Sequence, residues 1–72
     1  MKFRGERIRE LRQRYGHSLA LTCRLLEARL GFKTTKSSLS MWERGKYLPS
    51  LNALMALCEL YGVEMDYFFS EE

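Results

Sequence analysis

The hydrogen-bonding side chains of this chain are most concentrated in the stretch KSSLSMWERGKYLPS, which runs from Lys36 to Ser50. Short polar side chains share this stretch with the only tryptophan, Trp42. The spacing predicts a short amphipathic helix that stops at Gly45, and Pro49 followed by Ser50 announces a further helix. Such a helix either serves the fold alone or presents donors and acceptors that read another molecule.

Nucleophiles and metal ligands are sparse by comparison. No sequence pattern supplies a base for Cys23, Cys58 or a serine, so we expect no enzyme and no catalytic residues. Both cysteines fall within apolar helical patterns, which is typical of buried free thiols. The single histidine, His17, follows Gly16 and is interpreted as a solvated turn residue. With one histidine and no close cysteine pair, we expect neither a metal site nor a cofactor.

The length of 72 residues favours a single domain over residues 1–72. Hydrophobic residues make up 46% of the chain, yet no apolar run approaches the roughly 20 residues needed to cross a bilayer. The N-terminus is charged and helical in pattern, unlike a signal peptide. We therefore expect a cytoplasmic protein without a membrane partner.

Charge is divided sharply along the chain. All 12 lysines and arginines lie in residues 1–46 beside four acids, which gives 12 − 4 = +8. Residues 47–72 carry five acids and no base, which gives −5 and restores the total of +3. Solvated helix faces could account for any single basic residue, but the segregation as a whole favours one side that faces a polyanion.

Hydrophobic periodicity predicts an all-α fold, since the chain holds one valine, one isoleucine and no alternating β-branched run. Strands are not expected. The predicted helices span Arg4 to Arg14, about 18–30 with Ser18 as N-cap, about 36–44 with Thr35 as cap, Leu51 to Tyr61, and Met65 to Phe69. The residues expected to face inward are Ile8, Leu11, Tyr15, Leu19, Cys23, Leu26, Leu30, Leu39, Trp42, Leu51, Leu54, Leu57 and Leu60.

Four blocks of sequence resemble the lambda-repressor-like, or XRE-type, helix-turn-helix domains of phage and bacterial regulators. The blocks are GERIRELR (Gly5 to Arg12), LSMWERGKYLPSL (Leu39 to Leu51), LCELYGV (Leu57 to Val63) and MDYFF (Met65 to Phe69). Together they cover almost the whole chain. The resemblance implies a compact five-helix domain that binds double-stranded DNA through the helix at about 36–44.

One departure from the family pattern lies between Gly16 and Trp42, where this chain spends several more residues than the usual member. The surplus is interpreted as an extra turn on the second helix, a feature similar to some temperate-phage repressors. Those proteins also resemble this chain in their K-S-[ST]-L-S recognition helix. The family's usual glutamine at the start of the second helix is replaced here by Leu19. A phosphate contact is therefore expected only through the backbone of Ser18 and Leu19.

A helix that reads the major groove sends short or flexible polar side chains towards base edges while its other side anchors in the core. The residues that meet this requirement are Lys36, Ser37, Ser38, Ser40 and Met41. The resemblance places the main roles on Lys36, which suits guanine, on Ser37, and on Met41, which suits a thymine methyl. Trp42 is expected to anchor the helix in the core.

Phosphate contacts are expected from residues around that helix. The full predicted set is Arg12, Ser18, Leu19, Lys33, Arg44, Lys46 and Tyr47. By resemblance, Glu43 pairs with Arg12, which also meets a phosphate. This ion pair would orient the recognition helix against the first helix while the guanidinium presents donors outward.

The acidic C-terminal end is crowded with aromatic residues, more than a five-residue helix can hide within a small domain. Phe68 is expected to close the core. The remaining apolar residues predict a homodimer seam formed by Tyr61, Met65, Tyr67 and Phe69, which two-fold operator symmetry would exploit. The alternative is that all of them cover the core of a monomer.

These observations predict a sequence-specific transcriptional regulator, in particular a repressor of phage or mobile-element type that binds a palindromic operator. Two alternatives stay open. The chain could be the antitoxin of a toxin pair, with its acidic side gripping a basic toxin, or an antirepressor that keeps the fold as a protein-interaction module. A regulatory protein partner is therefore a further expectation.

Overall fold

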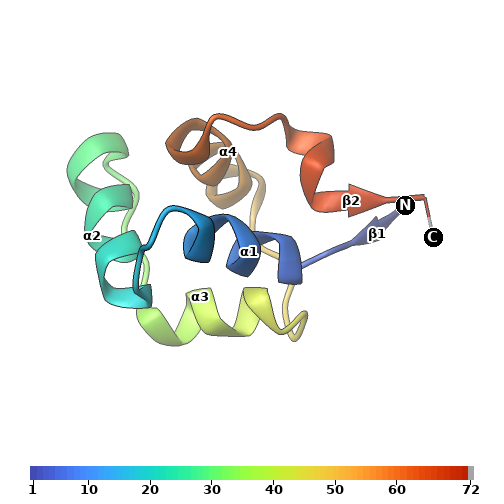
Figure 1. Ribbon diagram of the computed structural model, residues 1–72, viewed down its shortest axis with the longest axis horizontal. Coiled ribbons are helices and arrows are strands. Elements are labelled where there is room, and N and C mark those ends of the chain that lie inside the picture. The colour runs from blue at the N-terminus through green and yellow to red at the C-terminus, as the bar shows by residue number, and fades with distance from the viewer. Residues whose placement is uncertain (72) are drawn as a thin grey trace.

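The computed structural model describes residues 1–71, in which four α-helices surround one apolar core (Figure 1). In chain order the elements are β1 (Lys2–Phe3), α1 (Glu6–Arg14), α2 (Leu19–Leu30), α3 (Lys36–Glu43), α4 (Leu51–Tyr61), η1 (Met65–Phe68) and β2 (Phe69–Ser70). The helical class is as predicted. The expected fifth α-helix is instead the short 3-10 helix η1. Its four residues are enough for only about one turn, and such short segments commonly form i to i+3 hydrogen bonds. Glu72, counted above among the acids, lies outside the described residues.

The helix boundaries follow local capping chemistry. The hydroxyls of Ser18, Thr35 and Ser50 each accept a hydrogen bond from the amide three residues later, which satisfies one orphan donor of α2, α3 and α4. Helices α2 and α4 end at Gly31 and Gly62, both with φ of 66°, a conformation that glycine adopts without steric cost. The ends of α2 and α4 therefore lie where the sequence predicted them.

The core is built from one face of every α-helix. Its buried apolar residues are Ile8, Leu11, Leu26, Leu39, Ala53, Leu54, Ala56, Leu57, Tyr61 and Phe68. The prediction for Leu51 was wrong, since that side chain is 65% exposed. Helix α4 turns Ala53 and Leu54 inward in the first turn instead, which rotates Leu51 towards solvent. Tyr15 is also more than half exposed, at 53%.

The two ends of the described chain meet in a short antiparallel ladder. Lys2 pairs with Ser70 and Phe3 with Phe69, and the two phenyl rings lie edge to face at 5.8 Å. The expectation of no strands was wrong. Strands of two residues are too short to produce an alternating pattern, so only the meeting of the two ends creates them.

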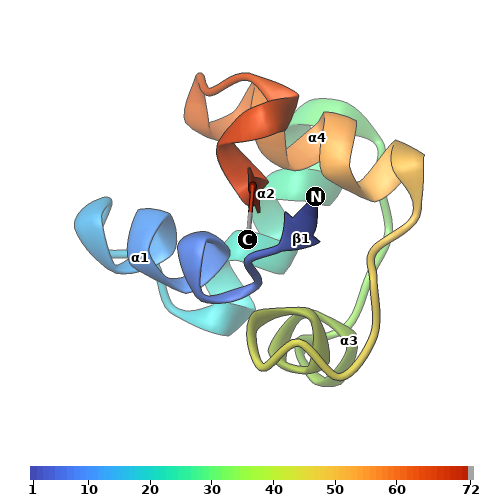
Figure 2. The same cartoon turned by 90° about the vertical axis from the view of Figure 1, so that its right-hand side faces the viewer.

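In Figure 1, helix α1 lies between α3 on one side and α4 with η1 on the other, and Figure 2 shows that α1 is also set to one side of α3 and α4. It packs against both α3 and η1, while α2 packs against α3 and α4. No helix in residues 1–71 combines the length and apolar character needed to span a bilayer.

Candidate nucleic-acid interface

Helix α3 has one face in the core and one face open. Leu39 is fully buried and Glu43 nearly so, and Trp42 packs partly buried against the core. At 100° per residue, the positions opposite these three form one outward stripe. The outward or partly outward side chains are those predicted to read bases: Lys36, Ser37 and Ser38 are exposed, and Ser40 and Met41 are partly exposed.

Two of these side chains have local partners. The Ser38 amide donates to the Thr35 hydroxyl at 3.1 Å, and that hydroxyl donates to the Ser38 oxygen at 3.2 Å. Ser38 therefore keeps its own hydroxyl proton for an external acceptor. Arg44 lies over the end of the stripe, with Nη2 3.4 Å from the Met41 sulfur. This contact places the Arg44 guanidinium beside the Met41 side chain on the open face of α3.

Gly5 is a positioning residue that the sequence interpretation missed. It is buried at the start of α1, and a Cβ there would overlap the carbonyl oxygen of Trp42 and lie 3.0 Å from the carbonyl oxygen of Glu43. Only a residue without a side chain lets α1 approach the end of α3 this closely. The only sequence signal was that a glycine immediately precedes an otherwise good helix.

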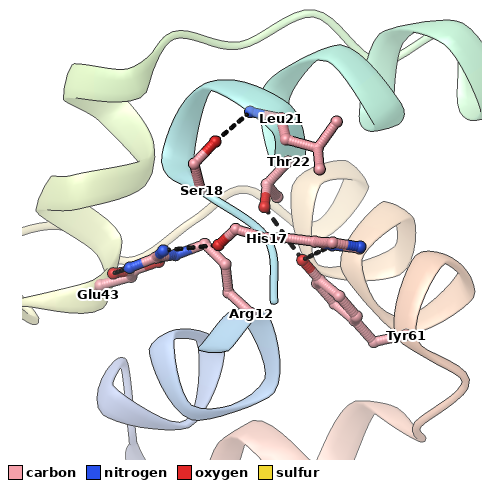
Figure 3. A network of polar contacts seen from close by, with 7 residues as sticks. All are labelled: Arg12, His17, Ser18, Leu21, Thr22, Glu43 and Tyr61. Atoms are coloured by element: carbon pink, nitrogen blue, oxygen red, sulfur yellow. Dashed lines mark hydrogen bonds and ion pairs between the residues drawn. The ribbon is translucent and has the colours of Figure 1, made fainter. Parts of the chain in front are cut away.

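Arg12 and Glu43 form a bidentate ion pair between α1 and α3 (Figure 3). Arg12 Nε donates to Oε2 at 2.7 Å and Nη2 donates to Oε1 at 3.0 Å. The side chains are only 11% and 6% exposed, so this pair is mostly withdrawn from solvent. The predicted pair is present, and its parallel geometry fixes the rotation of α3 about its own axis.

A third bond extends this pair to the turn before α2. Arg12 Nη1 donates to the backbone oxygen of His17 at 2.9 Å, so the guanidinium bridges α3 and the α1–α2 turn. The hydrogen bonds that Arg12 donates to the Glu43 carboxylate raise the pKa of Arg12 above its already high value, which keeps the guanidinium charged. Three of its five N–H donors point to protein acceptors. The predicted phosphate contact of Arg12 would use the remaining two.

A second polar cluster holds the same turn from the other side. The Tyr61 hydroxyl lies 3.1 Å from His17 Nδ1 and 3.1 Å from the Thr22 hydroxyl, linking α4 to the turn and to α2 (Figure 3). Tyr15 completes the cluster by donating to the Tyr61 carbonyl at 3.3 Å. Burial is the main reason that the pKa of Tyr61 is raised.

This cluster corrects two predictions. Tyr61 cannot form the dimer seam, because it is only 3% exposed and its hydroxyl is used inside the monomer. His17 is not a solvated turn residue, since its ring packs 5.7 Å from the rings of both Tyr15 and Tyr61. The sequence offered no signal for either contact, because the partners are far apart along the chain.

The N-terminus of α2 lies directly beyond this turn. The Ser18 hydroxyl accepts from the Leu21 amide at 3.0 Å, and the first-turn amides of Leu19 and Ala20 have no acceptor within the helix. The Leu19 side chain packs against the core, which leaves only its backbone for a ligand. Such amides at the positive end of a helix dipole are suited to a phosphate oxygen.

The other predicted phosphate contacts flank α3. Lys33 lies before it, whereas Arg44, Lys46 and Tyr47 follow it, and all four side chains are exposed. The structure thus places cationic or hydroxyl-bearing groups at both ends of the reading helix. Phosphate contacts from these residues stay predictions.

The remaining residues of the predicted dimer seam are only partly exposed. Tyr67 and Phe69 are held by Arg7, which donates to both of their carbonyl oxygens, at 2.9 and 3.2 Å, and lies 5.8 Å from the Tyr67 ring centre. Met65 packs partly against the core. A role for these three in a dimer stays a prediction. The most exposed large apolar residues besides Met1 and Tyr15 lie elsewhere: Tyr47, Leu48, Leu51 and Met55.

Within residues 1–71, no group of three or more histidine, cysteine, aspartate or glutamate side chains could hold a metal ion. Cys23 and Cys58 are free thiols, each partly buried. Burial raises the pKa of both thiols.

An outward polar face on a short helix, fixed to its neighbours from behind and flanked by cations, is the arrangement expected of a helix-turn-helix domain. A family model described as helix-turn-helix matches residues 8–68. The chain belongs to this family, the XRE or lambda-repressor-like helix-turn-helix proteins, as the sequence blocks indicated. No curated protein and no solved structure matches the chain. The family assignment supports a DNA-binding transcription regulator.

Proposed function

We propose that this regulator is a repressor of phage or mobile-element type, which binds a palindromic operator as a homodimer with α3 in the major groove. The observation that carries the proposal is the fixed orientation of α3. Gly5 and the Arg12–Glu43 pair hold its inner side, so the exposed side chains of Lys36, Ser37 and Ser38 are presented from a helix of fixed orientation.

Affinity for the duplex comes from the groups around α3. Lys33 precedes α3, Arg44 and Lys46 follow it, and all three side chains are exposed, whereas the acidic residues of the chain's last third lie beyond α3 in sequence. If each subunit neutralises about 4 to 6 phosphates, log affinity falls with log salt at a slope of about −4 to −5 per subunit. The proposed role is binding in the cytoplasm, without catalysis.

A dimer seam at the loop after α3 fits the exposed apolar residues better than one that includes Tyr61. Leu48 and Leu51 are 64% and 65% exposed, and they lie between the basic and the acidic segments of the chain. Pairing there brings the two copies of α3 near each other. The operator half-sites would then be centred about one helical turn, roughly 34 Å, apart.

The experiment is selection of bound fragments from random duplex DNA, followed by measurement of the mass of the complex on the selected site. The proposal expects an inverted repeat bound by two protomers. Leu51→Lys should reduce cooperativity and spare half-site binding, while Glu10→Lys, an exposed change on α1, should leave cooperativity unchanged. A single protomer on a site without symmetry would refute the homodimer. Repression is tested by placing the selected site in a promoter.

A further inference from the structure

The outer side of α4 carries an apolar groove. One hollow is lined by Met55, Cys58, Glu59, Val63 and Met65, and a second shares Met55 and Glu59 and extends to Phe32 beyond the end of α2. The two hollows lie side by side, because the exposed side chains of Met55 and Glu59 line both of them, and we call them together the α4 groove. Methionine side chains at its centre and end can adapt their shape to an occupant.

The groove lies away from the reading helix. Helix α4 with η1 and helix α3 lie at opposite ends of the molecule in both Figure 1 and Figure 2. Met55 is 53% exposed, so the centre of the groove is open in the monomer. An occupant of this groove and a DNA duplex on α3 would therefore approach the protein from different sides.

The rim of the groove is acidic. Glu59 lines it directly, and the charges of Asp66 and Glu64 act on Cys58 in its wall, where they add to burial in raising the pKa of that thiol. None of the three carboxylates forms an ion pair with a residue of the described chain. Residues 47–72 also contain no lysine or arginine that could neutralise them.

Charge decides what the groove can hold. A nucleic acid is excluded by the carboxylates, and a second copy docked face to face would bring two sets of three carboxylates together. An amphipathic helix could place apolar residues of one side against the apolar lining of the groove and pair lysines or arginines along its edges with the carboxylates of the rim. We propose that the α4 groove binds a basic amphipathic helix of a different protein, a partner that can dock while α3 is on DNA.

The probe is a fluorescent peptide of about 18 residues, long enough to form a helix, with leucines on one face and lysines elsewhere. The matched peptide carries glutamates in place of the lysines. Fluorescence anisotropy measures affinity, and amide NMR shifts on labelled protein locate the site. We expect the lysine peptide to bind with shifts centred on α4 and η1, and the glutamate peptide to bind at least about tenfold more weakly.

Two variant pairs test the assignment. Met55→Lys should weaken binding of the lysine peptide about tenfold, whereas Gln13→Lys adds the same charge at an exposed position on α1, outside the groove, and should change affinity little. Glu59→Lys should weaken binding severalfold, and Glu10→Lys on α1 should not. Both changed groove residues are exposed, so thermal melts and half-site DNA binding should stay normal.

The outcomes are separable from those of the proposed repressor function. Equal affinity for both peptides, shifts outside α4 and η1, or no binding would overturn the groove as a basic-helix site. A concentration-dependent dimer that Glu59→Lys strengthens and the peptide competes away would show that a second copy is the occupant. If the unmodified protein selects no operator, the result contradicts the proposed repressor function and not the groove proposal, because peptide binding is measured without DNA.

Discussion

The hydroxyl of Tyr61 lies 3.1 Å from Nδ1 of His17, which joins the end of α4 to the turn between α1 and α2. The backbone oxygen of the same histidine accepts from Arg12, whose other donors hold Glu43 on α3. One residue of the turn therefore connects the last α-helix to the reading helix. We therefore expect substitutions of Tyr61 to change both the stability of the fold and the affinity for DNA.

Tyr61→Phe should destabilise the fold by about 1 to 3 kcal/mol, because His17 and Thr22 lose a buried hydrogen-bonding partner. The same change should weaken binding to DNA of every sequence, and it should make the slope of log affinity against log salt shallower, because the N-terminus of α2 is no longer held in place. Thermal melts and binding titrations at several salt concentrations measure both effects. Tyr67→Phe is the control, and an unchanged salt slope with normal affinity would confine Tyr61 to a structural role.

Alkaline pH should destabilise the protein through Tyr61. Burial raises the pKa of folded Tyr61 above the ordinary tyrosine value of 10.0, so its contribution to stability is full below pH 10 and is lost as pH rises from there through the folded pKa. Stability curves of the unmodified protein and Tyr61→Phe should therefore converge above pH 10. Parallel curves across that window would mean that Tyr61 ionises equally easily in both states.

Glu43→Gln should cost about 3 kcal/mol, because it removes one charge of a mostly buried pair and leaves the guanidinium of Arg12 without its counter-ion. DNA affinity should fall further than stability alone explains, since the rotation of α3 is no longer fixed. Urea unfolding and operator titration on the same variant separate the two effects. Glu10→Gln, an exposed change on α1, is the matched control, and near-normal behaviour of Glu43→Gln would contradict the orienting role.

Gly5→Ala should push α1 away from the end of α3, because the added Cβ overlaps the Trp42 carbonyl, a backbone atom that cannot rotate aside. We expect destabilisation of about 1 to 3 kcal/mol as for other overpacked sites, together with weaker operator binding. Gly16→Ala is a useful comparison, since no atom lies near its Cβ and only its φ of 71° is strained. An unaltered melting temperature for Gly5→Ala would show that the two helices can separate freely.

Mutations should distinguish the residues that recognise bases from those that contact phosphates. Lys36→Ala or Ser37→Ala should change which sequence is preferred, at about 1 to 3 kcal/mol per lost base contact, whereas Lys46→Ala should weaken all sequences alike. Affinities for a panel of single-base operator variants measure the difference. Uniform weakening by Lys36→Ala would show that α3 is not the reader.

The bounds of α2 and α4 and the class of the fold could be predicted from the sequence. Ser18 and Ser50 cap helices through amides three residues away, and Gly31 and Gly62 end them in a left-handed conformation. Each signal acts within one helical turn, so it survives in the linear sequence. The Arg12–Glu43 pair was predicted only because its residues sit in blocks that resemble a known family.

Contacts between distant residues were decided by the tertiary structure alone. His17 and Tyr61 are separated by 44 positions, and β1 meets β2 across almost the whole described chain. The same packing buried Tyr61 and exposed Leu51, because the direction in which α4 faces the core depends on α2 and η1 rather than on its own periodicity. Local bonds encode where helices begin and end, whereas the angle at which they pack decides which side chains remain free to bind.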